Sequence, residues 1–265
     1  YILMRFYIFK FTLLLIFISG APLSSNASAE EKKSWQVVCA QVQNLEIPIS
    51  DRPKKNQIPK KQVLKNCDSK IPYYGIGQPL DYERARLCAF IELQANDDLV
   101  FGGSAILMML YANGFGVEKN IPLAEHFACN IGGAQAEMEG RIEHLEKMKT
   151  DSSKTPGFDL CDDITSGFMM GHCASIVNET EKATRNKILN SIIIKWSEAQ
   201  KKVFLKLQNA STEFTKERAG NEVDLSGTAR SMFQSDEEAM QEKDFIESLQ
   251  KLESGKAPKL SLIHI

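Results

Sequence analysis

The stretch from Thr184 to Ala219 constrains the fold more than any other part of the chain. It contains neither proline nor an internal glycine, and its apolar residues recur at steps of three and four. That spacing places them along one face of an α-helix, while lysines and a glutamate occupy the other face. The stripe consists of Leu189, Ile192, Trp196, Ala199, Val203, Leu207, Ala210 and Phe214. The pattern predicts a single helix, roughly 50 Å long at 1.5 Å per residue, that packs along its length against a core.

A second amphipathic helix is expected after a short, turn-rich connection at residues 220–228. Gly220 suits the position just past the end of the first helix, and Ser226 or Thr228 suits the N-cap of the second. The second helix places Ala229, Phe233, Met240, Ile246, Leu249 and Leu252 mostly on one face. Two long helices joined by a short connection are expected to lie antiparallel. A short helix flanked by Cys161 and Cys173 is expected in front of the hairpin. The sequence therefore predicts an all-α fold that ends in a long antiparallel helical hairpin domain.

Upstream of this hairpin, two glycine pairs repeat thirty-nine residues apart. Gly75-Ile76-Gly77 and Gly114-Phe115-Gly116 both follow aromatic residues, and each is followed eight residues later by an alanine, Ala85 or Ala124. A period near forty with helix, glycine turn and helix is typical of an α/α solenoid. The copy Ser104–Asn130 resembles a Sel-one-like repeat, a relative of the tetratricopeptide repeat. The resemblance implies a short region of stacked helix pairs.

Both ends of the chain are expected to lie outside the folded domains. Arg5 and Lys10 accompany a short apolar run, and Ala27-Ser28-Ala29 fits a cleavage site. Residues 1–29 are therefore predicted to be a signal peptide cut after Ala29, which places the mature protein in the periplasm or outside the cell. Residues 260–265 match the translation of a common sequencing adapter, so we expect an adapter-derived tail there, with a genuine apolar tail as the alternative.

Between these ends we expect a repeat region at 30–149, a linker at 150–157 and the helical domain at 158–255. The composition is that of a globular protein, with 43% hydrophobic and 25% charged residues. Removing residues 1–29 takes away two basic residues and no acid, so the net charge moves from −2 to −4. No basic patch stands out, which argues against a nucleic-acid partner. The apolar run of the leader is too short to leave a stable membrane anchor.

All six cysteines lie in the part of the chain that we expect to be exported. An even number of cysteines in an oxidising compartment indicates disulfides, although six cysteines allow fifteen connectivities. We favour Cys161–Cys173, which would staple the start of the hairpin domain, and Cys67–Cys88 within the first repeat. The remaining pair is then Cys39–Cys129.

The sequence offers no convincing set of catalytic or metal-binding residues. His126 and Cys129 are three residues apart and His172 adjoins Cys173, but no second pair has the spacing of zinc ligands. The acidic pairs Asp162-Asp163 and Glu237-Glu238 are more typical of helix starts and solvated faces. The chain has neither a nucleophile elbow nor a Walker-type phosphate loop. We therefore expect no enzyme, no metal and no cofactor.

Residues 161–252 resemble the lysozyme-inhibitor family named for LprI, over roughly a third of the chain. The matching features, in order, are Cys161, Cys173, Trp196, Gln200, Phe204, Leu207, Gln208, Phe214, Arg218, Ala219, Glu222 and Gly227-Thr228-Ala229. The resemblance implies an exported bacterial protein with a small helical domain that inhibits lysozyme. The repeat region in front of it is an addition to the simplest members of that family.

The turn of the hairpin carries the candidate partner-binding residues. Arg218, Glu222 and Arg230 flank it, and we expect them to form an ion-pair cluster that fixes the turn. The functional alternative is that the turn presents Glu222, Asp224 and Ser226 to a partner. Lysozymes are basic proteins, so an acidic inhibitor is steered toward them while a polar loop enters the catalytic cleft.

These features predict an exported, non-enzymatic binding protein, with lysozyme as the candidate partner. The alternative is an exported solenoid adaptor that binds another envelope protein through the repeat helices, with the hairpin domain in a structural role. The two hypotheses differ in where partner-blocking substitutions map: at the end of the hairpin for the first, and on the repeat helices for the second. The sequence leaves the oligomeric state open.

Overall fold

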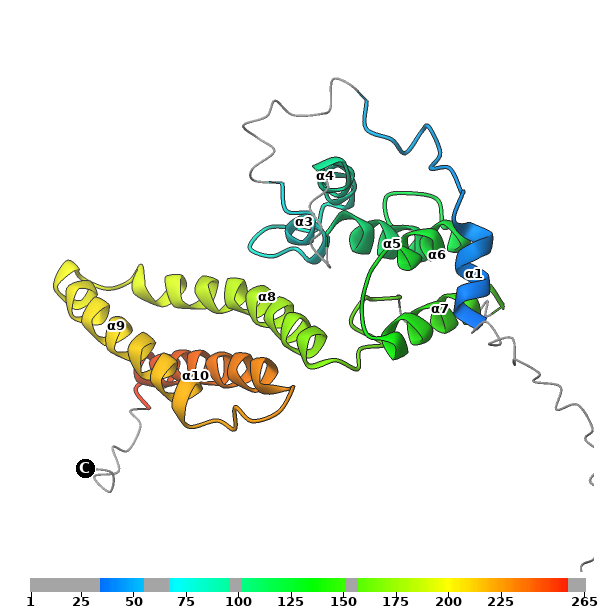
Figure 1. Ribbon diagram of the computed structural model, residues 1–265. Coiled ribbons are helices and arrows are strands. Elements are labelled where there is room, and N and C mark those ends of the chain that lie inside the picture. Colours follow the sequence, from blue (N-terminus) through cyan, green and yellow to red (C-terminus); the bar gives the residue numbers. More distant parts are fainter. Residues whose placement is uncertain (1–33, 55–66, 96–101, 151–156, 257–265) are drawn as a thin grey trace, which may run out of the picture. The chain divides into compact units, whose positions relative to one another are not determined.

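The computed structural model describes residues 34–54, 67–95, 102–150 and 157–256, and every regular element in those ranges is an α-helix (Figure 1). The predicted all-α class is confirmed. The expected signal peptide at 1–29, the tail at 260–265 and most of the linker at 150–157 lie outside the described residues.

The N-terminal helices are organised around one buried helix, α5. The helices of this part are α1 (Ser34–Val42), α3 (Lys70–Tyr74), α4 (Tyr82–Ala95), α5 (Gly103–Asn113), α6 (Ile121–Cys129) and α7 (Gln135–Thr150). Every residue from Ala105 to Ala112 is buried, as expected for a helix that is apolar all round. Helices α4 and α6 pack against α5, and α7 packs against α6.

The two glycine turns have the same backbone geometry. Gly75 and Gly114 both end a helix in the left-handed region, with φ of 68° and 72°, which an L side chain rarely adopts. The amide of Asp81 donates to the carbonyl of Pro72 at 2.9 Å, and thirty-nine residues later Asn120 donates to Tyr111 at 2.9 Å. The alanines that follow, Ala85 and Ala124, are both fully buried. The turns thus bring each following helix back onto the preceding one.

The three favoured cysteine pairs are all confirmed as disulfides. Cys39–Cys129 joins α1 to α6, Cys67–Cys88 joins the segment before α3 to α4, and Cys161–Cys173 joins the segment after α7 to α8. Disulfides persist in oxidising compartments and are rare in the cytosol. The pairing therefore indicates an environment outside the cytoplasm.

The C-terminal part contains three helices, but their bounds differ from the predicted short Cys-flanked helix and long hairpin. They are α8 (Gly167–Ile193), α9 (Glu198–Asn221) and α10 (Arg230–Glu253) (Figure 1). The prediction of one continuous helix over Thr184–Ala219 is wrong, because the chain leaves the helix after Ile193. A capping box then starts α9: Ser197 accepts a hydrogen bond from the amide of Gln200, and the Gln200 side chain accepts one from the amide of Ser197.

The expected caps around the next connection are also wrong. Gly220 lies inside α9, which ends at Asn221 with Glu222 after it. Helix α10 begins after Ala229 without a side-chain cap, so neither Ser226 nor Thr228 caps it.

Helix α10 lies beside both other helices, and α8 is its main partner. At the start of α8, a Cβ atom on Gly167 would lie 1.7 Å from the carbonyl oxygen of Thr228, so only glycine permits this approach. Past the end of α8, the indole of Trp196 donates to Glu253 at the far end of α10. Helices α8 and α10 are therefore parallel, and α9 returns antiparallel to both. Their shared core consists of Leu189, Ile192, Phe204, Ile246 and Leu249.

The apolar stripe predicted to face the core is buried on α8 and exposed on α9. Leu189 and Ile192 are buried as expected, but Val203, Leu207 and Phe214 are 68%, 50% and 54% exposed. The turn between α8 and α9 reverses the chain, so the two halves of the stripe no longer share one face. Helix α9 instead turns its other side inward, with Phe204, Thr215 and Ala219 buried.

Candidate protein-binding surface

The loop between α9 and α10 is exposed and organised by its own side chains. Asp224 accepts hydrogen bonds from the amide and the hydroxyl of Ser226, at 2.8 and 2.6 Å. This is an aspartate turn, in which a side chain replaces a backbone acceptor. The two hydrogen bonds lower the pKa of Asp224, so its carboxylate is charged at neutral pH. Glu222, Asp224 and Ser226 are all exposed, as the partner-binding hypothesis requires.

Arg218 anchors this loop to both helices. Its Nε donates to Glu237 of α10, and the same nitrogen lies 3.7 Å from Glu222. Arg230 forms no ion pair in this group and is exposed, so the expected cluster of Arg218, Glu222 and Arg230 is wrong in its third member. The third member of the cluster is instead Glu237. Its carboxylate also accepts a hydrogen bond from the side chain of Gln241, one helical turn further along α10.

A shallow pocket of about 430 Å³ lies beside the loop. Val223, Phe233 and Met240 supply its apolar lining, and the acids Asp224, Asp236 and Glu237 supply the polar part. Phe233 and Met240 are 41% and 44% exposed, so the apolar lining is open to solvent. A lysine or arginine of a partner fits this chemistry, because its aliphatic stem packs on apolar surface while its charged head meets carboxylates.

The segment around this pocket is strongly acidic. Between Glu217 and Glu247 the sequence has nine acidic and three basic residues. A cluster of one sign raises the local concentration of partners of the other sign and speeds their association. The charge and the pocket therefore favour the same partner, a basic protein surface.

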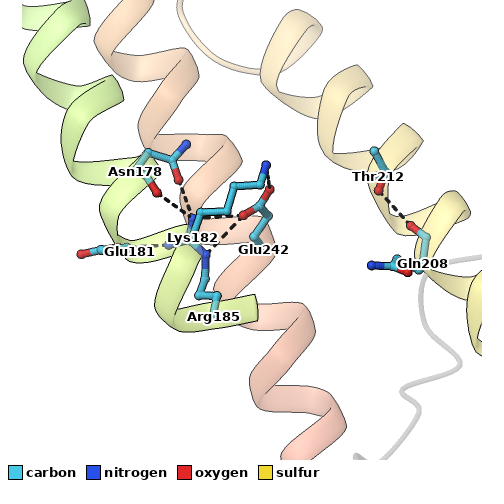
Figure 2. A network of polar contacts seen from close by, with 7 residues as sticks. All are labelled: Asn178, Glu181, Lys182, Arg185, Gln208, Thr212 and Glu242. Carbon is cyan, nitrogen blue, oxygen red and sulfur yellow. Dashed lines mark hydrogen bonds and ion pairs between the residues drawn. The ribbon is translucent and has the colours of Figure 1, made fainter. Parts of the chain in front are cut away.

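A second polar group lies between α8 and α10, around Arg185. Figure 2 shows the guanidinium of Arg185 on α8 reaching Glu242 on α10 and Asn178 on its own helix. Arg185 is only 8% exposed, and Glu181 also binds it, at 3.1 Å. Lys182 contacts the other oxygen of Glu242 at 3.0 Å. The charge of Arg185 is thus already matched by protein groups, which makes this network a structural junction.

A cavity of about 280 Å³ adjoins this junction and is lined partly by polar residues of α9. Gln208, Ser211, Thr212 and Thr215 form that lining, and the hydroxyl of Thr212 donates back to the carbonyl of Gln208 (Figure 2). The side of α9 that faces its neighbours is therefore mixed, with Phe204 and Ala219 buried beside these polar residues.

Several residues with the spacing of metal ligands or paired acids have structural partners. Cys129 and Cys173 form disulfides, and His126 lies 2.9 Å from the carbonyl oxygen of Val42. Asp163 pairs with His144 at 2.9 Å. Among the residues that the structure describes, no group of three or more His, Cys, Asp or Glu is placed to hold a metal.

A half-buried tyrosine and carboxylate connect α3 to the segment before α8. Tyr74 donates to Asp159 at 3.0 Å, and burial, with Asp159 next, raises the pKa of Tyr74. Burial raises the pKa of Asp159 as well. The amide of Cys161 also donates to Asp159, so this carboxylate secures the backbone that leads into α8.

The loop residues could be predicted from the sequence, but the pocket next to them could not. In the sequence Glu237 stands out only as half of an acidic pair, and nothing there joins it with Asp236, Phe233 and Met240 as the lining of one pocket. Phe233 and Met240 are seven residues apart on one face of α10, on either side of the polar residues 234–238, and this spacing is a local signal. The pairing of Glu237 with Arg218 has no local signal, because it depends on how α9 meets α10.

No family model, no curated protein and no solved structure matches this chain. Membership of the lysozyme-inhibitor family therefore stays a prediction. Within the described ranges, none of the helices combines the length and the apolar character needed to cross a membrane. What the protein does is inferred from its own residues.

Proposed function

We propose that this chain is an exported, non-enzymatic binding protein that acts as a lysozyme inhibitor of the LprI type. The observation that carries the proposal is the acidic pocket beside the loop at residues 222–226. An apolar lining of Val223, Phe233 and Met240 meets the carboxylates of Asp224, Asp236 and Glu237. This combination is built to accept the basic side chain of another protein.

Lysozyme fits as the partner because of its charge and the shape of its active site. Lysozymes are basic, and their catalytic acids lie in a cleft that holds the polysaccharide. The acidic segment from Glu217 to Glu247 steers such a protein toward the loop. The loop then blocks the cleft or its rim, which inhibits the enzyme without any chemistry in the inhibitor.

The loop is prepared for binding because its shape is held before a partner arrives. The aspartate turn at Asp224 and the contacts of Arg218 with Glu222 and Glu237 restrict the conformations that it samples. A loop that is ordered in advance loses less conformational entropy on association. In this mechanism Arg218 positions the loop, and Glu222, Asp224 and Ser226 contact the partner.

Export is part of the same proposal. The three disulfides require an oxidising environment. A signal peptide at residues 1–29, cut after Ala29, delivers the chain to the periplasm or the medium, where it meets lysozyme.

The direct test is reversal of the loop charge. Glu222→Lys combined with Asp224→Lys is expected to weaken inhibition of a basic lysozyme by tenfold or more, because two attractive charges become repulsive. The matched control is Glu118→Lys with Glu143→Lys, which changes two exposed acids outside the acidic segment by the same charge. Cell-wall lysis measured against inhibitor concentration provides the comparison. Inhibition that the loop substitutions leave unchanged would contradict the proposed site.

The second candidate function is that of a solenoid adaptor. The observation in its favour is the equal geometry of the two glycine turns, which carry matching hydrogen bonds thirty-nine residues apart. Stacked helix pairs of the Sel-one-like kind bind partners through their exposed helix surfaces. Under this hypothesis, partner-blocking substitutions map to exposed positions on α4 and α6, and the loop variant binds normally.

A further inference from the structure

Helix α9 carries an apolar face that nothing in the described part of the chain covers. This face consists of Val203, Leu207, Ala210 and Phe214, at successive steps of four, three and four. These steps are those of helices that pair along an a/d seam. Val203, Leu207 and Phe214 are each at least half exposed. A chain that leaves three large apolar side chains of one helix in water presents an interaction surface.

A groove lies along the first half of the same face. It has a volume of about 590 Å³, and Trp196, Phe204, Leu249 and Leu252 line it together with Val203 and Leu207 of the α9 apolar face. The second half of the face has a protruding aromatic ring, Phe214. One helix thus combines a groove near its start with a ring that can fill such a groove near its end.

The charged residues beside the apolar face also differ between the two halves of α9. Lys206 directly precedes Leu207, and Glu213 directly precedes Phe214, so both lie on the same flank of the seam. This flank therefore has a basic residue in the first half of α9 and an acidic residue in the second. A helix with this order of charges is complementary to itself when two copies run in opposite directions.

We propose that α9 pairs antiparallel with α9 of a second copy of this chain. In the register that we infer, Val203 lies opposite Phe214 of the second copy, and Leu207 lies opposite Ala210 of the second copy. Each layer thus sets a large side chain against a smaller one, which lets the helices interdigitate. Phe214 of each copy enters the groove of the other.

The same register pairs the charges. Lys206 lies opposite Glu213 of the second copy, and the two-fold axis repeats this pair. In the single chain Glu213 pairs with Lys216 at 3.3 Å, but both side chains are largely exposed, and such a pair is weak. Glu213 can therefore exchange Lys216 for Lys206 of the second copy at little cost in free energy. Because both the shapes and the charges match their own copy, a second copy is the occupant that this surface favours.

The dimer leaves the proposed inhibitor loop free. That loop follows the end of α9, so antiparallel pairing of two α9 helices places the two loops at opposite ends of the pair. The apolar seam has only four layers per helix, which is a small interface, and we expect a dissociation constant in the micromolar range. Dimerisation is independent of lysozyme and is tested without it.

The test is the mass of the disulfide-bonded protein in solution, measured by sedimentation over a series of micromolar concentrations. The wild type is expected to move from one chain to two as the concentration rises. Phe214→Asp should raise the dissociation constant by about 100-fold or more. The substitution buries a carboxylate in the interface and leaves both grooves empty. Leu205→Asp is the matched control, because Leu205 is 57% exposed on another side of the same helix.

A charge exchange gives a second test that does not depend on hydrophobic side chains. Lys206→Glu alone and Glu213→Lys alone should each weaken the dimer about tenfold, since each places like charges opposite one another. The double variant, Lys206→Glu with Glu213→Lys, should restore it. A wild type that stays at one chain at every concentration overturns the proposal. So does a double variant that is no stronger as a dimer than the single variants.

Discussion

Arg185 is buried and contacts three polar side chains. We expect the stability of the C-terminal helices to depend on these contacts. Its guanidinium contacts Glu242, Glu181 and Asn178, and 8% of the residue is exposed. A buried charge is costly alone, but removing one partner of a buried pair is also costly, because the other partner remains desolvated.

Replacing Arg185 by alanine should therefore destabilise the protein severely. We expect Arg185→Ala to lower the free energy of unfolding by about 3 kcal/mol. Lys182→Ala, which removes the more exposed contact to the same Glu242, should cost less than about 1 kcal/mol. Denaturant unfolding of both variants checks this difference. Equal effects of the two substitutions would show that Arg185 is not the junction of the network.

Glu125 of α6 makes stability depend on pH. Its side chain is fully buried, with Lys149 of α7 2.8 Å away. Burial raises the pKa of Glu125 to about 7, well above the ordinary value of 4.5, although Lys149 lowers it in part. The folded protein therefore binds a proton at Glu125 between about pH 4.5 and 7, where the unfolded chain does not.

The sign of the effect follows from this uptake. The native state is favoured below the folded pKa, so the contribution of Glu125 to stability should fall as the pH rises from about 4.5 to 7. Glu125→Gln, which stays neutral, should flatten this part of the profile. Thermal unfolding at a series of pH values measures it. A profile with the same slope in both proteins would contradict the assigned pKa.

At the scale of elements, periodicity predicts helices well but does not show where one ends and the next begins. Helix α7, Gln135–Thr150, follows the helical spacing of its apolar residues, and Ile142, Leu145 and Met148 are buried. The stripe over Thr184–Ala219 is equally regular, yet it spans two helices. The break depends on Ser197 and Gln200, whose capping box competes with continuation of the helix.

The direction of an apolar face depends on tertiary contacts. The stripe of α9 is apolar, but α9 buries a different side. The turn after α8 sets the orientation of α9 against α8 and α10. The pocket of the candidate site has the same origin, since Val223 and Met240 meet only when α9 and α10 fold back on each other. The sequence could therefore predict the exposed acidic loop but not its neighbours.

Loss of the capping box should destabilise the start of α9. Ser197→Ala removes the hydroxyl that accepts from the amide of Gln200, and we expect a cost of about 1 kcal/mol. Ser191→Ala is the control, because Ser191 is an exposed serine inside α8 that bonds only to the carbonyl of Ile188. Denaturant unfolding compares the two. A larger loss at Ser191 than at Ser197 would contradict the role of the capping box.

For the whole molecule, the disulfides differ in how much chain they close. Cys39–Cys129 spans 90 residues and Cys161–Cys173 spans 12. A longer closed loop removes more entropy from the unfolded chain, so replacing the first pair by alanines should cost about 4.5 kcal/mol and replacing the second about 3 kcal/mol. Unfolding of the two double variants gives the order. The reverse order would show that the short bridge contributes through local packing at the start of α8.

The two proposals assign the C-terminal helices separate surfaces. The loop after α9 and its acidic pocket meet a basic partner, and the apolar face of α9 meets a second copy. Charge reversal at Glu222 and Asp224 should leave the dimer intact, and Phe214→Asp should leave the loop intact. Each surface can therefore fail its test without affecting the other.

The most direct test of the proposed function is the lysis of bacterial cell walls by purified lysozymes of several classes, with and without the disulfide-bonded protein. We predict inhibition of at least one basic lysozyme, and loss of that inhibition after the disulfides are reduced, because the helices that hold the loop depend on them. If no class of lysozyme is inhibited by the oxidised protein, the inhibitor function is contradicted, and the adaptor hypothesis takes its place.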